Sequence, residues 1–227
     1  MKKKLIIILQ ARCSSKRLPK KILKKINGIP IILLCIKRLT NKGTKLIVAT
    51  SKDKSDDILV KLLKKHKIKF FRGELLNVLS RYQSIAKNLN PRDYIIRATA
   101  DNVFPDGKLV NKVFKIFKSG KKDYFGINHK DHNLPKGISL EIFQAKKILS
   151  LKKNLSKSDK EHVTQHIYRT KSKKFYKKII KSIKNNKNLS NKSVSIDTLK
   201  ELNFVRSIFK NFKNPSKISM DKLLEFV

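Results

Sequence analysis

Residues 5–21 read LIIILQARCSSKRLPKK, an apolar run that gives way at once to a small, polar and basic stretch. The five apolar residues predict a buried strand, and the stretch after them predicts a loop. Three further largely apolar runs follow, at 45–50, 68–73 and 94–100. Apolar runs without the alternation of a half-exposed strand are typical of a parallel sheet that is covered on both faces.

Helical patterns separate these runs, at 29–39, 56–66 and 77–89, and another follows at 107–120. We expect Pro30 at the first helical position of the first pattern and Ser55 as the N-cap of the second. Strands that alternate with helices indicate an α/β fold with a mostly parallel, doubly wound central sheet.

The regular alternation of strand and helix patterns ends after residue 123. Runs at 123–128 and 138–143 predict strands, and the spacing over 158–169 predicts a helix. VSID at 194–197 predicts a late strand, and a helical pattern follows it at 198–212. We therefore expect residues 1–227 to form one domain, in which about 125–170 is inserted before the chain rejoins the main sheet.

The charge of the chain is extreme, since 56 Lys and Arg stand against 16 Asp and Glu, a formal net charge of +40. Such a charge attracts nucleic acid through long-range fields, and an RNA-binding protein is one interpretation. That interpretation predicts aromatic residues interleaved with the basic ones for base stacking. The aromatic residues fall mostly in apolar runs instead, and the lysines are spread along the whole chain. We therefore expect no nucleic-acid partner.

The first residues, MKKKLIIIL, imitate a secretion signal. Their apolar run is shorter than the about 7–15 residues that a signal requires, and Arg12 follows almost at once. No stretch approaches the about 20 apolar residues of a transmembrane helix. Cys13 and Cys35 show no metal-type spacing, as expected of free thiols in a reducing compartment. These features predict a cytoplasmic protein with no membrane partner.

The loop after the first predicted strand concentrates groups that bind phosphate. Arg12, Arg17 and Lys21 accompany the small residues Ser14 and Ser15. Ligands of open α/β sheets bind beyond the carboxyl ends of the strands, and backbone N–H groups with fixed cations there suit a triphosphate. The glycine spacings of the P-loop and of dinucleotide-binding motifs are missing. A solvated basic turn is the ordinary alternative.

A solvated basic turn does not explain two aspartates that lie at predicted strand ends. Asp101 follows the fourth apolar run, and Asp197 ends the late strand. Magnesium typically takes one or two carboxylates together with substrate phosphate and water. An acid pair opposite a basic loop is the charge arrangement of metal-assisted attack on a nucleotide phosphate. Taken alone, Asp197 also suits an N-cap of the helix that follows.

EHVTQH at 161–166 places His162 and His166 at the i, i+4 spacing of metal ligands. The metalloprotease pattern requires a glutamate directly after the first histidine, where this chain has Val163, and no third ligand is evident. A structural or substrate-side role is therefore favoured over zinc.

At this point several segments together resemble a known family. They occur in order at 10–23, 48–57, 70–82, 97–102, 135–143, 161–167 and 195–202, and read QARCSSKRLPKKIL, VATS–DD, FRGELLNVLSRY, RATADN, PKGISLEIF, EHVTQHI and SIDTLKEL. This series resembles the sugar-activating cytidylyltransferases of the spore-coat polysaccharide type. Those proteins are similar to CMP-Kdo and CMP-sialic acid synthetases, and the resemblance spans nearly the whole chain.

The resemblance implies a Rossmann-like nucleotide-diphosphosugar-transferase fold. It implies Mg²⁺-dependent transfer of CMP from CTP to a sugar with release of pyrophosphate, in surface polysaccharide or glycan biosynthesis. The acceptor would be Kdo, a nonulosonate or a related cell-surface sugar. It also implies a homodimer through residues 125–170. A member of the fold that uses another nucleotide, or has lost activity, is the alternative.

Residue roles follow from the same resemblance. The catalytic residues would be Lys21, Arg17 and Asp101, and Mg²⁺ would be held by Asp101 and Asp197. The nucleotide would be bound by Ala11, Arg12, Ser14, Ser15, Arg17, Lys21, Ala49, Thr50, Arg72, Thr99 and Ala100. The sugar would be bound by Glu141, His162 and Gln165.

Two residues depart from the family pattern. Lys20 stands where the family usually has glycine, and Ser139 stands where this subgroup tends to have aspartate. If residue 20 requires a positive φ, lysine is strained there. Alternatively the loop has shifted and Lys20 adds a phosphate contact. Neither departure removes the cationic or acidic positions.

Overall fold

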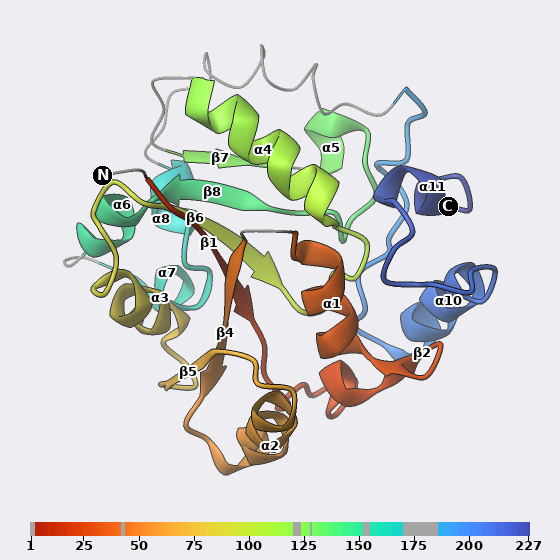
Figure 1. The fold of residues 1–227 in the computed structure, drawn as a ribbon, viewed down its shortest axis with the longest axis horizontal. Helices are drawn as coiled ribbons and strands as arrows, with labels where there is room; N and C mark the ends of the chain where they lie inside the picture. Colours follow the sequence, from red (N-terminus) through yellow and green to blue (C-terminus); the bar gives the residue numbers. More distant parts are fainter. Residues whose placement is uncertain (1–2, 42–43, 120–123, 128, 152–154, 170–185) are drawn as a thin grey trace.

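The computed structural model describes residues 3–41, 44–119, 124–127, 129–151, 155–169 and 186–227 (Figure 1). Its main sheet has six strands in the order β5-β4-β1-β6-β8-β7. The first four of these strands are mutually parallel, whereas β8 runs antiparallel to β6 and β7 antiparallel to β8. The predicted α/β fold with a mostly parallel sheet is confirmed.

The strands of the main sheet are β1 (Leu5–Gln10), β4 (Lys45–Ser51), β5 (Phe70–Gly73), β6 (Tyr94–Thr99), β7 (Tyr124–Gly126) and β8 (Glu141–Gln144). A two-stranded ribbon is formed by β2 (Lys25–Ile26) and β3 (Ile29–Pro30). The longer helices are α1 (Ile31–Leu39), α2 (Asp57–Lys65), α3 (Val78–Ala86), α4 (Gly107–Ser119) and α10 (Leu199–Phe209). Shorter helical segments are η1 (Lys21–Leu23), η2 (Lys54–Asp56), α5 (His129–His132), α6 (Ala145–Leu149), α7 (Lys157–Glu161), α8 (Gln165–Arg169) and α11 (Met220–Leu224).

The central strand β1 is buried on both faces. Ile7 and Leu9 pack into a core formed with α1, α2, α4, α10 and α11. Ile6 and Ile8, which point the other way, pack with α3, α6 and α8. Full burial of each such side chain contributes about 1.5–3 kcal/mol to the free energy of unfolding, which explains why the strand carries no polar side chain until Gln10.

Two predicted helix starts are wrong by one residue. Pro30 pairs with Lys25 in the β2–β3 ribbon, so its extended backbone precedes α1 as the N-cap. Ser55 lies inside the short turn η2, because the Asp53 carboxylate accepts a hydrogen bond from the Ser55 N–H and starts that turn earlier. The chain then passes from η2 directly into α2.

The predicted late strand at 194–197 is also wrong. Only an isolated bridge joins Ser193 to Lys136, and Ile196 donates its N–H to the Asp101 carbonyl (3.0 Å). Strand β6 already pairs with β1 and β8, so no edge beside it is free for another strand. The segment therefore crosses the end of the sheet without joining it.

Part of the region predicted as an insertion belongs to the main sheet, since β7 and β8 form its antiparallel edge (Figure 1). Residues 128 and 152–154 of this region lie outside the described residues, so the extent of the insertion stays a prediction. None of the described helices is both long enough and apolar enough to span a membrane.

Candidate active site at the carboxyl ends of the strands

The loop after β1 is held by its own backbone and by one buried carboxylate. The N–H groups of Ser15 and Lys20 both donate to the Cys13 carbonyl (2.9 and 3.1 Å), which folds the loop back on itself. The Cys13 N–H donates to Asp56 Oδ1 (2.6 Å), and Asp56 also accepts from the N–H and hydroxyl of Ser51. Asp56 is fully buried, so it fixes the loop after β1 to the end of β4.

Lys20 adopts the left-handed conformation, with φ 52° and ψ 30°. The sequence-based alternative of a strained lysine at the family's glycine position is therefore confirmed. The side chain of Lys20 is exposed and is not part of the cavity lining described below.

Replacing Lys20 with glycine is expected to raise the free energy of unfolding by about 0.5–1 kcal/mol. The left-handed conformation costs a non-glycine residue about 1–2 kcal/mol, and the greater flexibility of unfolded glycine cancels part of that gain. Denaturant unfolding measures the change. Lys67→Gly is a matched comparison, because exposed Lys67 (φ 54°) follows α2 and lines neither of the cavities described below. A Lys20→Gly protein that is less stable than the parent would contradict the strain.

The strongest electrostatic feature is an ammonium between two carboxylates. Lys21 Nζ contacts Asp101 Oδ2 at 3.2 Å and Asp197 Oδ1 at 2.9 Å, and it also donates to the Ile196 carbonyl at 2.9 Å. The Lys21 side chain is only 12% exposed. Both carboxylates contact the same nitrogen, so the two predicted metal ligands lie beside one small space although they are far apart in sequence.

Arg17 completes the charge pattern by placing a guanidinium nitrogen 3.1 Å from Asp197 Oδ2. Partial burial alone would raise the pKa of Asp197. The hydrogen bond and charge of Lys21, together with the charge of Arg17, outweigh burial and lower that pKa below its usual value. Asp197 is therefore ionised at neutral pH, as a metal ligand must be.

Asp197 is not the N-cap of α10. Thr198 holds that position, and its side chain and that of Glu201 form a reciprocal capping box. The Glu201 carboxylate accepts from the Asp197 N–H (2.9 Å). The Asp197 carboxylate therefore faces Lys21 and Arg17. The alternative interpretation of Asp197 as a helix cap is wrong.

The loop and the acid pair open onto one cavity of about 730 Å³. Its lining includes the following residues predicted for nucleotide, metal or sugar: Ala11, Arg12, Ser14, Ser15, Arg17, Lys21, Thr99, Ala100, Asp101, His162 and Asp197. A smaller cavity of about 310 Å³ lies beside it and shares Thr99, Asp101 and Asp197. The acid pair therefore lies between two adjacent cavities and lines both.

Three residues predicted to contact the nucleotide do not reach the cavity. Ala49 and Thr50 are fully buried in β4, where the Ala49 carbonyl accepts from the Ala11 N–H (3.1 Å). Arg72 donates to the Ser51 carbonyl (2.8 Å) and pairs with Asp57 (2.7 Å). These three residues therefore contact the strand ends and loops around the site without lining the cavity.

Glu141, predicted to bind sugar, is held by three partners. It pairs with Arg97 at 2.5 Å and accepts from the hydroxyls of Tyr124 and Thr164, each at 2.5 Å. Burial alone would raise the pKa of Glu141, but the Arg97 charge and these hydrogen bonds keep it below its usual value. Arg97 lines the smaller cavity, so Glu141 orients Arg97 and does not itself line either cavity.

The two histidines lie on separate elements, because the predicted helix over 158–169 breaks at His162 into α7 and α8. His162 lines the larger cavity, whereas the Gln165 side chain accepts from the Ser158 hydroxyl (2.6 Å) outside both cavities. Helical i, i+4 spacing no longer relates His162 to His166. Within the described parts of the chain, no three His, Cys, Asp or Glu side chains cluster as metal ligands.

The structure adds lining residues that the sequence did not single out. Leu75 and Leu76, between β5 and α3, line the larger cavity, and Leu76 is 79% exposed. Asn102 and Lys136 line the smaller one. The signal for Leu75 and Leu76 was a pair of leucines in the short turn before Asn77, and the signal for Asn102 was its position directly after Asp101.

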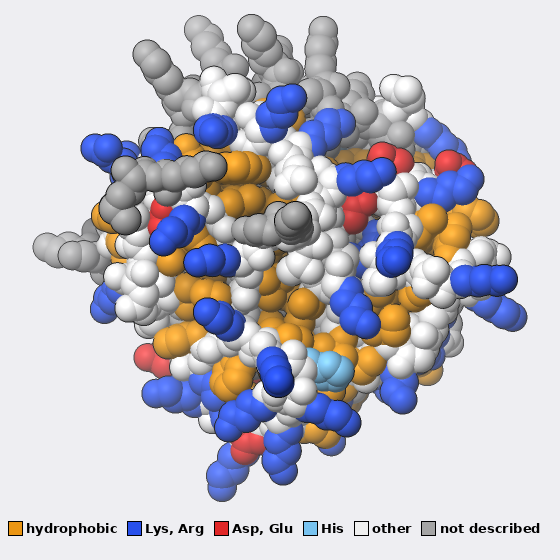
Figure 2. All heavy atoms as spheres, viewed as in Figure 1, with side chains coloured by type: hydrophobic (Ala, Val, Ile, Leu, Met, Phe, Trp, Pro, Cys, Tyr) orange, Lys and Arg blue, Asp and Glu red, His pale blue; other side chains and the backbone are white. Residues whose placement is uncertain are grey.

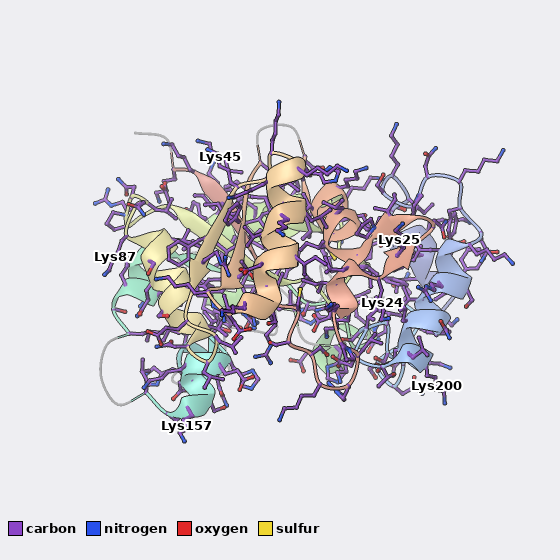
Figure 3. All side chains as sticks on the ribbon, turned by 90° about the horizontal axis from the view of Figure 1, so that it is seen from below. Lys24, Lys25, Lys45, Lys87, Lys157 and Lys200 are labelled. Atoms are coloured by element: carbon purple, nitrogen blue, oxygen red, sulfur yellow. The ribbon has the colours of Figure 1, made fainter. Side chains whose placement is uncertain are left out.

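Positive charge is not confined to this site. Lysines lie on many sides of the molecule, and Figure 3 labels six of them in different parts of the fold. On the face shown in Figure 2, blue side chains are scattered among orange and white ones without forming one continuous patch. This distribution agrees with a general lysine bias.

Comparison with known proteins shows which family the chain resembles. The cytidylyltransferase family model matches residues 6–221. The spore coat polysaccharide biosynthesis protein SpsF of Bacillus subtilis is 30% identical over 171 residues, which cover 72% of this chain and 69% of SpsF.

Two solved structures share the fold. A cytidylyltransferase from Leptospira borgpetersenii superposes with a TM-score of 0.83 at 23% identity, covering 99% of this chain and 93% of that one. CMP:2-keto-3-deoxy-manno-octonic acid synthetase, solved with CTP, superposes with a TM-score of 0.59 at 14% identity, covering 92% and 99%. The resemblance inferred from the sequence motifs is confirmed, and the chain belongs to the cytidylyltransferase family.

Proposed function

We propose that this protein transfers CMP from CTP to a hydroxyl group of a sugar and releases pyrophosphate, with Mg²⁺ as the metal. The observation that carries the proposal is the acid pair Asp101–Asp197, which faces a basic loop at the junction of two cavities. The larger cavity would take the nucleotide, and the smaller one the acceptor.

The loop after β1 would hold the triphosphate. Arg12, Arg17 and Lys21 line the larger cavity together with Ser14 and Ser15. Guanidinium and ammonium groups form strong charge-assisted hydrogen bonds with phosphate oxygens. Arg12 now lies 3.7 Å from Glu161 across the cavity, a weak contact between half-exposed groups that phosphate would readily replace.

Asp101 and Asp197 would hold Mg²⁺. Two carboxylates with no third protein ligand nearby among the described residues suit an ion that keeps substrate phosphate and water in its coordination sphere. When bound, the ion would supply positive charge to the α-phosphate region and lower the pKa of the attacking hydroxyl. The Lys21 ammonium, on its flexible four-carbon stem, would then turn from the acid pair toward the phosphates.

In the reaction, the sugar hydroxyl oxygen forms a bond to the α-phosphorus of CTP while the bond to the bridging oxygen of pyrophosphate breaks. The hydroxyl proton would leave to solvent, since no side chain of the described residues is placed as an evident general base. Arg17 and Lys21 neutralise the negative charge that gathers on departing pyrophosphate. This is catalysis by positioning and charge stabilisation, which dominates phosphoryl and nucleotidyl transfer.

The smaller cavity supports an acidic acceptor. Arg97, His129 and Lys136 line it, and the carboxylates among its described lining residues are the shared pair Asp101 and Asp197. A sugar acid such as Kdo or a nonulosonate would bring a carboxylate to this basic wall. We further propose a cytoplasmic homodimer that serves surface polysaccharide or glycan biosynthesis.

Pyrophosphate release with each of the four nucleoside triphosphates, Mg²⁺ and a panel of neutral and acidic sugars tests the function. We expect release only with CTP plus an acidic sugar, and a rise in melting temperature with CTP and Mg²⁺. The proposal fails if CTP neither stabilises the protein nor turns over with any sugar. Tight RNA binding above physiological salt without CTP turnover would favour the RNA-binding alternative instead.

A further inference from the structure

Arg81, in α3, is a fully buried arginine to which the reaction proposed above gives no role. Its Nε donates to the Glu74 carbonyl and its Nη2 to the Leu75 carbonyl, each at 2.7 Å. Within the described part of the chain it forms no ion pair, and Nη1 has no hydrogen-bond partner. Burying a charged guanidinium without an ion pair costs free energy, and its two hydrogen bonds to carbonyl groups offset part of that cost.

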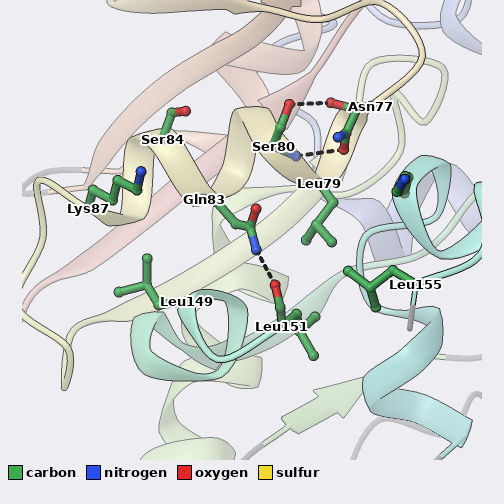
Figure 4. Close-up of a pocket in the computed structure, with 10 residues that line it drawn as sticks. Asn77, Leu79, Ser80, Gln83, Ser84, Lys87, Leu149, Leu151 and Leu155 are labelled. Atoms are coloured by element: carbon green, nitrogen blue, oxygen red, sulfur yellow. Dashed lines mark hydrogen bonds between the residues drawn. The ribbon is translucent and has the colours of Figure 1, made fainter. Parts of the chain in front are cut away.

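The helix that carries Arg81 is anchored at its start and at a second point along its length (Figure 4). The Asn77 side chain accepts from the Ser80 N–H (3.0 Å) at its start, and the Gln83 amide donates to the Leu151 carbonyl (2.6 Å) further along. Gly73 admits the side chain, because a Cβ there would lie 2.9 Å from Arg81 Cγ. Arg81 therefore holds the 74–76 loop by hydrogen bonds from a helix that is itself held in place.

The two hydrogen bonds from Arg81 determine the direction of two peptide N–H groups. In a trans peptide the C=O and the following N–H point in opposite directions. With the carbonyls of Glu74 and Leu75 turned toward Arg81, the N–H groups of Leu75 and Leu76 point away from it. Neither N–H has a hydrogen-bond partner among the described residues, and both leucines line the larger cavity.

We propose that Arg81 is a positioning residue that directs the N–H groups of Leu75 and Leu76 toward the base of the bound nucleotide. This inference rests on the proposed use of CTP. Cytosine presents two neighbouring acceptors, O2 and N3, which match two N–H donors. Uracil carries a hydrogen on N3, so one donor would meet another donor. Leaving a donor unpaired in this way disfavours the wrong base.

Arg81→Met and Arg81→Lys test the role by affinity and kinetics. We expect Arg81→Met to raise the Kd and KM for CTP about tenfold and to reduce the preference for CTP over UTP by a similar factor, as expected for loss of an aligned hydrogen bond. The kcat for CTP should change less than about threefold, since the phosphate groups are untouched. Arg81→Lys should recover only part of the preference, because an ammonium lacks the fork that reaches two carbonyls.

A pair of variants at exposed Leu76 tests the N–H directly if Arg81→Met fails to fold. Leu76→Pro removes the N–H, whereas Leu76→Ala keeps it and removes the same side chain. We expect only the proline variant to lose the preference for CTP over UTP, with melting temperatures recorded for both.

Four results would count against the inference, in three different ways. A folded Arg81→Met protein with parental CTP and UTP affinities, or equal behaviour of the two Leu76 variants, would overturn it while leaving cytidylyl transfer intact. A parent protein that binds CTP and UTP equally would overturn the base-reading role alone. A parent protein that binds no CTP would overturn the proposed function itself.

Discussion

Asp101→Asn is expected to abolish sugar-dependent pyrophosphate release, with a loss of about a thousandfold or more. Metal stabilisation of transition-state charge is worth several kcal/mol, and each ~1.4 kcal/mol is a factor of ten in rate. The neutral amide keeps the shape of the side chain but loses the negative charge that would hold Mg²⁺. Initial rates over a range of Mg²⁺ concentrations measure the loss, and Mn²⁺ binding followed by electron paramagnetic resonance measures the metal independently of turnover.

The fold is expected to survive this change, because Lys21 keeps Asp197 and the Ile196 carbonyl as partners. Asp221→Asn, at an exposed position in α11, is the matched control and should leave both rate and Mn²⁺ binding unchanged. Parental activity or parental Mn²⁺ affinity in Asp101→Asn would refute the assignment of Asp101 as a metal ligand.

Lys21→Met is expected to lower the rate of CMP transfer by about 10- to 100-fold, since a hydrogen bond to a charged group contributes about 1.5–3 kcal/mol. Methionine retains much of the length of the side chain and loses the ammonium that would neutralise pyrophosphate as it leaves. The ratio kcat/KM for CTP, measured at saturating acceptor, reports the change.

Lys25→Met controls for the loss of one positive charge from a very basic protein. Lys25 is an exposed lysine of β2, outside both cavities, so its replacement should leave kcat/KM unchanged. Equal effects of the two substitutions would mean that overall charge matters and that the contact of Lys21 with the acid pair does not.

The sequence predicted the sheet well because burial acts directly on residue choice. A strand that is covered on both faces, such as β1, allows almost no polar side chain, and the end of this strand is marked where Gln10 appears. The loop after β1 was predicted for a related reason. Arginines and small residues directly after a buried strand are conspicuous in a chain whose usual cation is lysine.

Other parts depend on which side chains meet across the fold, and a sequence pattern does not carry that information. VSID has the composition of a strand, yet β6 has no free edge beside it, so the segment crosses the sheet end and still delivers Asp197 to Asp101. Glu141 was located in the correct region, but its three partners come from β6, β7 and the turn between α7 and α8. Arg81 matched a family segment, and only the structure shows which carbonyls it holds.

The ammonium between Asp101 and Asp197 has a consequence for protein engineering. Many active sites hold like charges together at the expense of folding, so replacing their charged residues makes the protein more stable. Here Lys21 compensates the acid pair within the fold, and removing it leaves Arg17, on a side chain that is 65% exposed, as the remaining cation in contact with either carboxylate among the described residues. If Lys21 has the proposed catalytic role, catalysis and folding select the same lysine, and a search for stabilising substitutions would find no trade-off to exploit at this position.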